Sequence, residues 1–250
     1  MVSAVALAGL PQVGPGDDLA TLIASALKDR ERLEHGDVLV VAHKAVSKAE
    51  GRTRRLSDVV PSARAIELAG AHAKDPRLVQ VVLDESQSLL RAAHGVLICV
   101  TRHGFVCANA GVDASNVAGD DVVVLLPLDP DASARALRAR LASITGVSPG
   151  IVITDSFGRA WRHGQLDIAI GCAGLEPLED WRGRRDAFGR ELKATSIAIA
   201  DQLAATADLA RSKDGLQPVV LVRGASRHTL ADDGPGALAL LRPRADDLFR

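Results

Sequence analysis

Aromatic side chains are scarce in this chain of 250 residues. Tyrosine is absent, and two tryptophans with four phenylalanines make an aromatic share of only 2%. Proteins that bind single-stranded nucleic acid stack its bases on aromatic rings, so this composition argues against such a platform. Charge does not point that way either, because 30 basic and 31 acidic residues leave a net charge of −1. We therefore expect neither nucleic acid nor a membrane surface as a partner.

Cysteine and long apolar runs are also in short supply. Cys99, Cys107 and Cys172 lie in apolar surroundings without the Cys-x-x-Cys spacing of zinc and redox sites. This favours buried free thiols in a reducing compartment over a metal or redox site. No run approaches the ~20 apolar residues that span a bilayer. The apolar start lacks a basic region and meets Pro11 too soon for a signal peptide. We expect a soluble cytoplasmic protein.

Several nucleotide-binding and catalytic motifs are missing as well. The chain has no Gly-x-Gly-x-x-Gly after its first predicted strand, and no Gly-x-x-x-x-Gly-Lys-Ser/Thr. Neither a Rossmann dinucleotide site nor a P-loop is therefore indicated. Gly-x-Ser-x-Gly and His-Glu-x-x-His are absent too, which argues against an α/β-hydrolase and a zinc protease. If this protein handles a nucleotide, it does so with an uncommon fold.

The sequence does contain an alternation of strand and helix patterns. Continuous apolar runs predict buried strands, and apolar residues at helical spacing over 19–27 predict an amphipathic helix. The predicted strands cover residues 2–8, 38–41, 122–126, 151–154 and 218–222, with a hairpin over 96–108. The predicted helices cover 19–27, 61–73, 76–90, 131–143, 191–211 and, as a short piece, 237–241. This interleaving predicts a mixed α/β fold.

A polar loop follows the predicted hairpin. Asn109, Gly111, Asp113, Ser115 and Asn116 bring small polar groups together within eight residues, without a helical or strand period. Such a loop can present carboxylate and amide oxygens to a hard cation, Mg²⁺ or Mn²⁺. The alternative is a loop held by Asx-turns, and the segment alone favours neither.

Polar residues also follow the predicted strand at 38–41. His43, Lys44 and Lys48 come after its carboxyl end, where open α/β sheets place their ligands. The two lysines suit phosphate groups. Solvated lysines are the alternative, and without other information they are slightly the better interpretation.

Asp155 and Ser156 come in the same way after the predicted strand at 151–154. A carboxylate at the carboxyl end of a strand is a frequent catalytic or metal-binding position. One such aspartate is weak evidence. Together with Asp113, however, it makes a dication site more plausible.

Five segments taken together resemble one known family. They are Gly-Leu-Pro-Gln-Val at 9–13, Ser-Lys-Ala-Glu-Gly at 47–51, Asn-Ala-Gly-Val-Asp-Ala-Ser-Asn at 109–116, Thr-Asp-Ser-Phe-Gly-Arg at 154–159 and Gly-Arg-Glu-Leu at 189–192. The chain resembles the coenzyme F420:L-glutamate ligase family (coenzyme F420-0 gamma-glutamyl ligase) from about residue 5 to 224. Its likeness is closest to the N-terminal ligase domain of the actinobacterial bifunctional form.

The resemblance implies a fold and a division of the chain. The implied fold is the gamma-glutamyl ligase fold of two intertwined α/β subdomains, which is neither Rossmann nor P-loop. Residues 1–224 would form the ligase domain. Residues 225–250 would form a C-terminal tail or the start of a linker to an absent flavin-binding domain.

The resemblance also implies a reaction. It is the GTP-dependent ligation of L-glutamate to coenzyme F420-0, or to its dehydro precursor, through an acyl phosphate, followed by further gamma-linked glutamates. Such chemistry needs dications across the phosphates, cationic groups and good positioning. Mg²⁺ or Mn²⁺, with K⁺ as a further candidate ion, and a homodimer are implied with it. The alternative is a non-catalytic module that binds the deazaflavin or the nucleotide and acts with a separate flavin reductase domain.

Residue by residue, the resemblance implies a site. The implied metal ligands are Asp113, Asp155 and Ser156, and the implied catalytic residues are Lys48, Asp113 and Asp155. The implied nucleotide contacts are Leu10, Pro11, Gln12, Val13, His43, Lys44, Lys48 and Asn116. The chain departs from the family at 211–217, where relatives often have a Gly-rich loop with an acidic or amide metal ligand and this chain has Lys213 near that position. The pair His43 and Lys44 replaces the smaller hydroxyl residues of some relatives.

Overall fold

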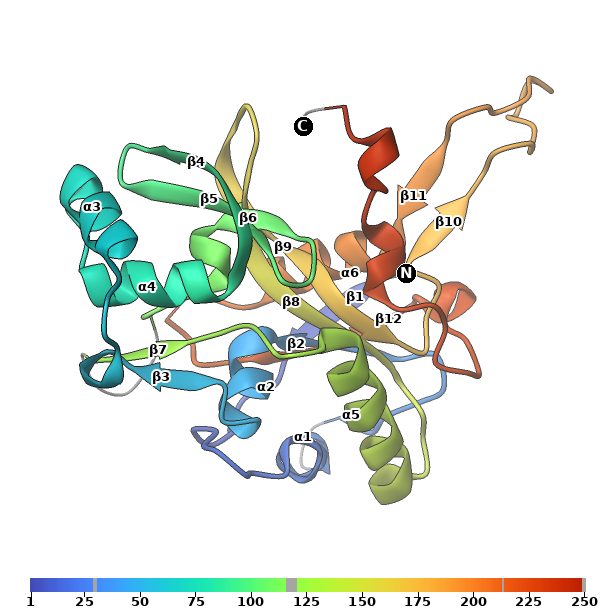
Figure 1. The fold of residues 1–250 in the computed structure, drawn as a ribbon. Helices are drawn as coiled ribbons and strands as arrows, with labels where there is room; N and C mark the ends of the chain where they lie inside the picture. The colour runs from blue at the N-terminus through green and yellow to red at the C-terminus, as the bar shows by residue number, and fades with distance from the viewer. Residues whose placement is uncertain (29–30, 116–120, 213, 249–250) are drawn as a thin grey trace.

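The computed structural model describes residues 1–28, 31–115, 121–212 and 214–248 (Figure 1). Its α-helices are α1 (Leu19–Lys28), α2 (His43–Ala49), α3 (Ala63–His72), α4 (Pro76–Asp84), α5 (Pro130–Thr145) and α6 (Ile199–Ala210). Its strands are β1 (Ser3–Ala6), β2 (Val38–Ala42), β3 (Thr53–Arg55), β4 (Ser86–Ala93), β5 (Val96–Thr101), β6 (Val106–Ala108), β7 (Val122–Val124), β8 (Gly150–Arg159), β9 (Arg162–Ala173), β10 (Leu178–Asp180), β11 (Ser196–Ala198) and β12 (Val219–Arg223). The predicted mixed α/β class is confirmed.

A five-stranded sheet in the order β1-β12-β2-β8-β9 forms the centre of the molecule. β2 and β8 run parallel, and the other neighbours are antiparallel. Alternate residues of β2 enter two different cores: Leu39 and Val41 pack in the core that holds residues of α1 and α5, whereas Val38 and Val40 pack in the core that holds residues of α6. Because both faces of the sheet are covered, β2 is a continuous apolar run, as its sequence predicts.

A third core is built by the segment between α2 and α5. Its residues include those of α3, α4, β4, β5 and β7; the same region holds β6, paired with β5, and β3, paired with β7. In Figure 1 these elements lie together on one side of the central sheet. Phe105, just before β6, and Cys107, inside it, pack in the first core of the central sheet. This contact brings the end of the β5–β6 hairpin against β8.

Two predicted helices are partly wrong. The helix predicted over 76–90 ends at Asp84, and β4 follows, because residues 86–93 pair with β5. The helix predicted over 191–211 begins only at Ile199, because Ser196–Ala198 pairs with β10. In both places strand pairing with a distant segment overrides the local helical pattern. The helix predicted over 131–143 is present as α5, and Asp129 caps it by accepting a hydrogen bond from the Ala132 amide at 2.9 Å.

The strand predicted over 151–154 is longer than expected. β8 continues to Arg159 because β9 pairs with it along its whole length, from Ile151 opposite Ala173 to Arg159 opposite Arg162. Asp155 and Ser156 therefore lie within a strand rather than after it. Their backbone is fixed by the sheet, which matters for the site described below.

Residues past the predicted division at 224 pack on the central sheet. Ala225 and Ala237 are buried in the core that contains α6. The buried Asp131 accepts hydrogen bonds from the backbone amides of Ala237 and Leu238. A ligase domain of 1–224 followed by a tail or linker stays a prediction.

The structure also bears on the predictions made for the cysteines and for long apolar segments. Cys99, Cys107 and Cys172 are buried and free, as predicted. Burial raises the pKa of Cys107 and Cys172 to about 12, which makes both thiols poor nucleophiles at neutral pH. In the part of the chain that the structure describes, no helix is both long enough and apolar enough to cross a membrane.

Candidate functional site

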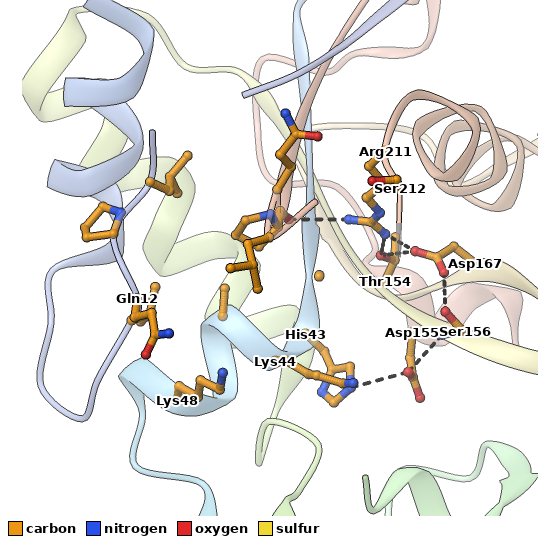
Figure 2. A pocket seen from close by; sticks show the side chains of 18 residues that line it. Gln12, His43, Lys44, Lys48, Thr154, Asp155, Ser156, Asp167, Arg211 and Ser212 are labelled. Atoms are coloured by element: carbon orange, nitrogen blue, oxygen red, sulfur yellow. Dashed lines mark hydrogen bonds and ion pairs between the residues drawn. The ribbon is translucent and has the colours of Figure 1, made fainter. Parts of the chain in front are cut away.

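A cavity of about 390 Å³ lies where β2 and β8 run side by side (Figure 2). The parallel pairing sets Ala42 opposite Thr154, so the next residues of the two segments, His43 and Asp155, emerge together. The cavity walls come from the connection between β1 and α1, from α2, from β8 and β9, and from the segment that follows α6. Among the predicted site residues, the cavity brings together Leu10, Pro11, Gln12, Val13, His43, Lys44, Lys48, Asp155 and Ser156.

The side chains of His43 and Asp155 face one another in this cavity (Figure 2). The Nε2 atom of His43 lies 3.3 Å from Oδ1 of Asp155, and Nδ1 lies 3.4 Å from the hydroxyl oxygen of Ser47. The His43 side chain is only 2% exposed, and within the described chain its Nε2 makes no hydrogen bond. A buried polar atom without a hydrogen bond is unusual in proteins. The site can therefore accept another polar group beside Asp155.

Lys44 and Lys48 place two positive charges on one side of α2, one turn apart. Like charges at this spacing destabilise a helix. Burial lowers the pKa of Lys48, and the positive charge of Lys44 lowers it further. An anion in the cavity would relieve both effects. This arrangement favours the phosphate interpretation of the two lysines over the solvated one.

Asp113 is held at the edge of the site by Lys44. The ammonium group of Lys44 lies 2.5 Å from Oδ2 of Asp113 and 2.7 Å from the hydroxyl oxygen of Ser115. The Asp113 carboxylate also accepts a hydrogen bond from the Ser115 amide at 2.7 Å, so the Asx-turn, one of the two alternatives for this loop, is present. Burial raises the pKa of Asp113, but the hydrogen bonds from Lys44 and Ser115 outweigh it, and the pKa is lowered overall. Asp113 is not among the described residues that line the cavity.

A second ion pair lies in the wall of the cavity, between β8, β9 and the end of α6. Asp167 accepts hydrogen bonds from the hydroxyl groups of Thr154 at 2.8 Å and Ser156 at 2.6 Å, and it pairs with the guanidinium of Arg211. Arg211 also donates to the hydroxyl oxygen of Thr154 at 3.1 Å. The amide of Ser156 in turn donates to Oδ1 of Asp155 at 2.8 Å. Ser156 thus connects the carboxylates of Asp155 and Asp167, both of which line the cavity.

The amino-acid sequence of the chain resembles known proteins over most of its length. A family model described as F420-0:Gamma-glutamyl ligase matches residues 9–224. The chain belongs to this family. It is 45% identical over 251 residues to the coenzyme F420:L-glutamate ligase of Methanothermobacter thermautotrophicus, an alignment that covers 100% of this chain and 99% of that protein. It is 46% identical over 241 residues to the protein of the same name from Methanopyrus kandleri, which covers 96% and 94% of the two chains.

A third relative with this name, from Archaeoglobus fulgidus, is 46% identical over 245 residues, covering 97% of this chain and 94% of that protein. These relatives are archaeal and match over nearly their whole length. The predicted membership in the F420-0:gamma-glutamyl ligase family is confirmed. The greater likeness to the actinobacterial N-terminal domain stays a prediction.

The chain offers few protein ligands for a metal ion at the family site. Among the described residues, no group of three or more His, Cys, Asp or Glu side chains is arranged to hold one. Mg²⁺, however, is usually bound by one or two carboxylates together with substrate phosphates and water. Asp155, Ser156 and the His43 Nε2 atom without a hydrogen bond fit that kind of site. Asp113 fits it only if its contact with Lys44 is shared or released.

Sequence reasoning missed Thr154, Asp167 and Arg211. Asp167 lies directly across from Ser156 in the register of β8 and β9, a pairing visible only once the 150–173 hairpin is known. Arg211 falls where the ligase family often has a Gly-rich loop, and the structure puts its side chain into the cavity wall. Asn116 and Lys213 lie outside the described residues, so the nucleotide contact predicted for Asn116 and the departure from the family's metal ligand near Lys213 stay predictions.

Proposed function

We propose that this protein ligates L-glutamate to coenzyme F420-0 and then adds further gamma-linked glutamates, using GTP and a divalent cation. Family membership and the names of three relatives support the coenzyme and the amino acid. The observation that carries the GTP and cation part is the cavity itself. Two lysines of one helix line the same cavity as the carboxylate of Asp155, a combination suited to phosphates bound with a cation.

The proposed reaction forms an acyl phosphate. A carboxylate of the acceptor attacks the γ-phosphorus of GTP, GDP leaves, and the amine of glutamate then displaces phosphate from the acyl carbon to form the amide. Lys44 and Lys48 would place positive charge against the phosphates, which stabilises the charge that develops during transfer. Leu10, Pro11 and Val13 provide an apolar wall and Gln12 an amide in the same cavity, which suits a nucleobase.

The cation would be held by Asp113, Asp155 and Ser156 together with the phosphates. When bound, it would neutralise charge on the transferred phosphoryl group. For Asp113 to take part, Lys44 must move from Asp113 to a phosphate. That exchange replaces one anionic partner of the lysine by another. We propose Mg²⁺ or Mn²⁺ for this position, with K⁺ as a further ion to be tested.

Three further points are proposed on the resemblance to the ligase family. The protein would work as a homodimer, would accept either F420-0 or its dehydro precursor, and would reside in the cytoplasm. Sedimentation of the purified protein tests the first point, since a monomer at assay concentrations would contradict it. Competition between the two coenzyme forms in one reaction tests the second. Cell fractionation tests the third.

A mass-spectrometric assay tests the reaction. Purified protein is incubated with coenzyme F420-0, L-glutamate, GTP and Mn²⁺, and products are resolved by mass. Whole glutamyl units should be added, and the additions should cease when GTP or the cation is omitted or when ATP replaces GTP. GTP binding without any addition would contradict the ligase and favour the non-catalytic binding module.

A further inference from the structure

A buried carboxylate to which the proposed reaction gives no role lies in the wall of the cavity. Asp167 occupies the β9 position across from Ser156, and its side chain is 2% exposed. One carboxylate oxygen accepts the Ser156 hydroxyl at 2.6 Å, and the other accepts the Thr154 hydroxyl and the Arg211 guanidinium. Figure 2 shows these four side chains converging on the same wall of the cavity.

Burying the ion pair of Asp167 and Arg211 has a large desolvation cost. The two side chains are 2% and 11% exposed, so both charges are largely removed from water. A buried ion pair is often no more stable than apolar residues of similar volume. Stability alone therefore does not account for a charged pair here. Its position against the residues of the cavity suggests another use.

Ser156 is the residue through which Asp167 reaches the cavity. A serine hydroxyl has one hydrogen, and in this structure Asp167 receives it. Toward a further group in the cavity, the Ser156 oxygen can then act only as an acceptor or as a ligand to a cation. The backbone amide of the same serine donates to Oδ1 of Asp155 at 2.8 Å. The sheet fixes this amide and Asp167 fixes the hydroxyl, so both groups of Ser156 keep a set position relative to Asp155.

We propose that Asp167, held by Arg211 and Thr154, is a positioning residue for the site. It keeps the Ser156 hydroxyl oriented as an oxygen ligand and, through Ser156, holds the carboxylate of Asp155 in the cavity. The inference rests on the proposed function in so far as Asp155 and Ser156 bind the cation. Groups that hydrogen-bond to metal ligands typically change metal affinity by about 10–100-fold when they are removed.

The test removes both charges of the pair at once. The double variant Asp167→Leu/Arg211→Met leaves no unpaired charge in the interior, so it is expected to fold. Mn²⁺ binding is measured by electron paramagnetic resonance in the presence of a non-hydrolysable GTP analogue. The affinity should fall about 10–100-fold. The matched control is Arg52→Met/Glu85→Leu, which removes a pair of 22% and 11% exposure away from the cavity and should leave Mn²⁺ affinity unchanged.

A double-mutant cycle shows whether Asp167 acts through Ser156. Ser156→Ala is combined with the single variant Asp167→Asn, which keeps the shape of the side chain. If Asp167 positions the serine hydroxyl, its replacement costs much less Mn²⁺ affinity once that hydroxyl is gone. Losses that multiply to within about twofold would show independent residues. They would overturn the positioning role.

Crystal structures of the wild type and of the apolar double variant test the positioning role without any ligand. The Ser156 hydroxyl and the Asp155 carboxylate should leave their wild-type positions in the variant. If wild-type protein binds no Mn²⁺ with the nucleotide analogue, the cation part of the proposed function fails, and the crystals alone decide the positioning role. Unmoved Ser156 and Asp155 side chains would overturn it in either case.

Discussion

Two ion pairs meet at the cavity, and they are built in opposite ways. Lys44 and Asp113 join α2 to a loop, with side chains 22% and 40% exposed. Arg211 and Asp167 join the end of α6 to β9 in the central sheet, with side chains 11% and 2% exposed. The first pair is partly in water and the second is almost entirely out of it.

Their surroundings assign them different physical roles. The Lys44–Asp113 pair is partly exposed, and exposed ion pairs contribute about 0–1 kcal/mol, so Lys44 can exchange Asp113 for another anion at a lower cost than a buried pair would impose. Breaking a buried pair by removing one partner costs about 3–5 kcal/mol, because a charge is left without compensation in the interior. The exposed pair is therefore suited to change when ligands bind. The buried pair is suited to stay intact and hold the strands beneath.

The largest effect is expected from Asp155, which stands on the fixed side of the cavity. Asp155→Ala should lower the rate of glutamate ligation on the order of 10⁴-fold, the scale seen when a residue essential to the chemistry is removed. β8 is fixed by its neighbours β2 and β9, so circular dichroism should show an intact fold. Asp58→Ala, at an exposed aspartate outside the cavity, is the control and should retain activity. An Asp155→Ala protein with normal, metal-dependent activity would refute the site.

The second largest effect concerns stability. The two ion pairs should contribute differently to the free energy of unfolding. Arg211→Met leaves Asp167 buried without its cation, and we expect the free energy of unfolding to fall by about 3–5 kcal/mol. Lys44→Met should lower it by less than about 1 kcal/mol. Urea denaturation of both variants measures the difference. Equal losses would abolish the distinction between an adaptable and a fixed pair.

The exposed pair should matter more for binding than for folding. Lys44→Met removes a charge-assisted contact to phosphate worth about 1.5–3 kcal/mol, so the KM for GTP should rise about 10–100-fold. Steady-state ligation assays at fixed glutamate and coenzyme measure it. Lys193→Met, at an exposed lysine that does not line the cavity, should leave the KM for GTP unchanged. An unchanged KM in Lys44→Met would show that this lysine binds only Asp113.

Local patterns in the sequence predict much of the frame of this site. Apolar runs at 38–41 and 151–154 indicate strands covered on both faces, and the structure contains both. Polar residues at the end of the first run, with Lys44 and Lys48 one turn apart, indicate a ligand-binding edge. The nucleotide contacts at residues 10–13 came from resemblance to the ligase family and not from any local pattern.

The buried network could not be predicted, because it depends on contacts between distant segments. Asp167 meets Ser156 only through the register of β8 and β9, and that register contains an irregularity between Ile153 and Thr154. Arg211 reaches Asp167 across 44 residues of sequence. Likewise, His43 approaches Asp155 because β2 and β8 are parallel neighbours, which neither strand shows by itself.

The smallest effect concerns the proton equilibrium of Lys48. Its pKa lies below the ordinary 10.5, first because the side chain is buried and second because Lys44 is near. The charged Lys48 therefore lowers the free energy of unfolding by its full amount at any pH below the lowered pKa. This destabilisation disappears as the pH rises from that value through 10.5.

In Lys44→Met the pKa of Lys48 should rise but remain below 10.5, since burial persists. Carbon-13 NMR titration of the lysine ε-carbons measures it, with Lys193 as an exposed reference. The GTP analogue should also raise the pKa of Lys48, because the phosphates favour its charged form. If neither change moves the titration of Lys48, the two lysines do not share one anion.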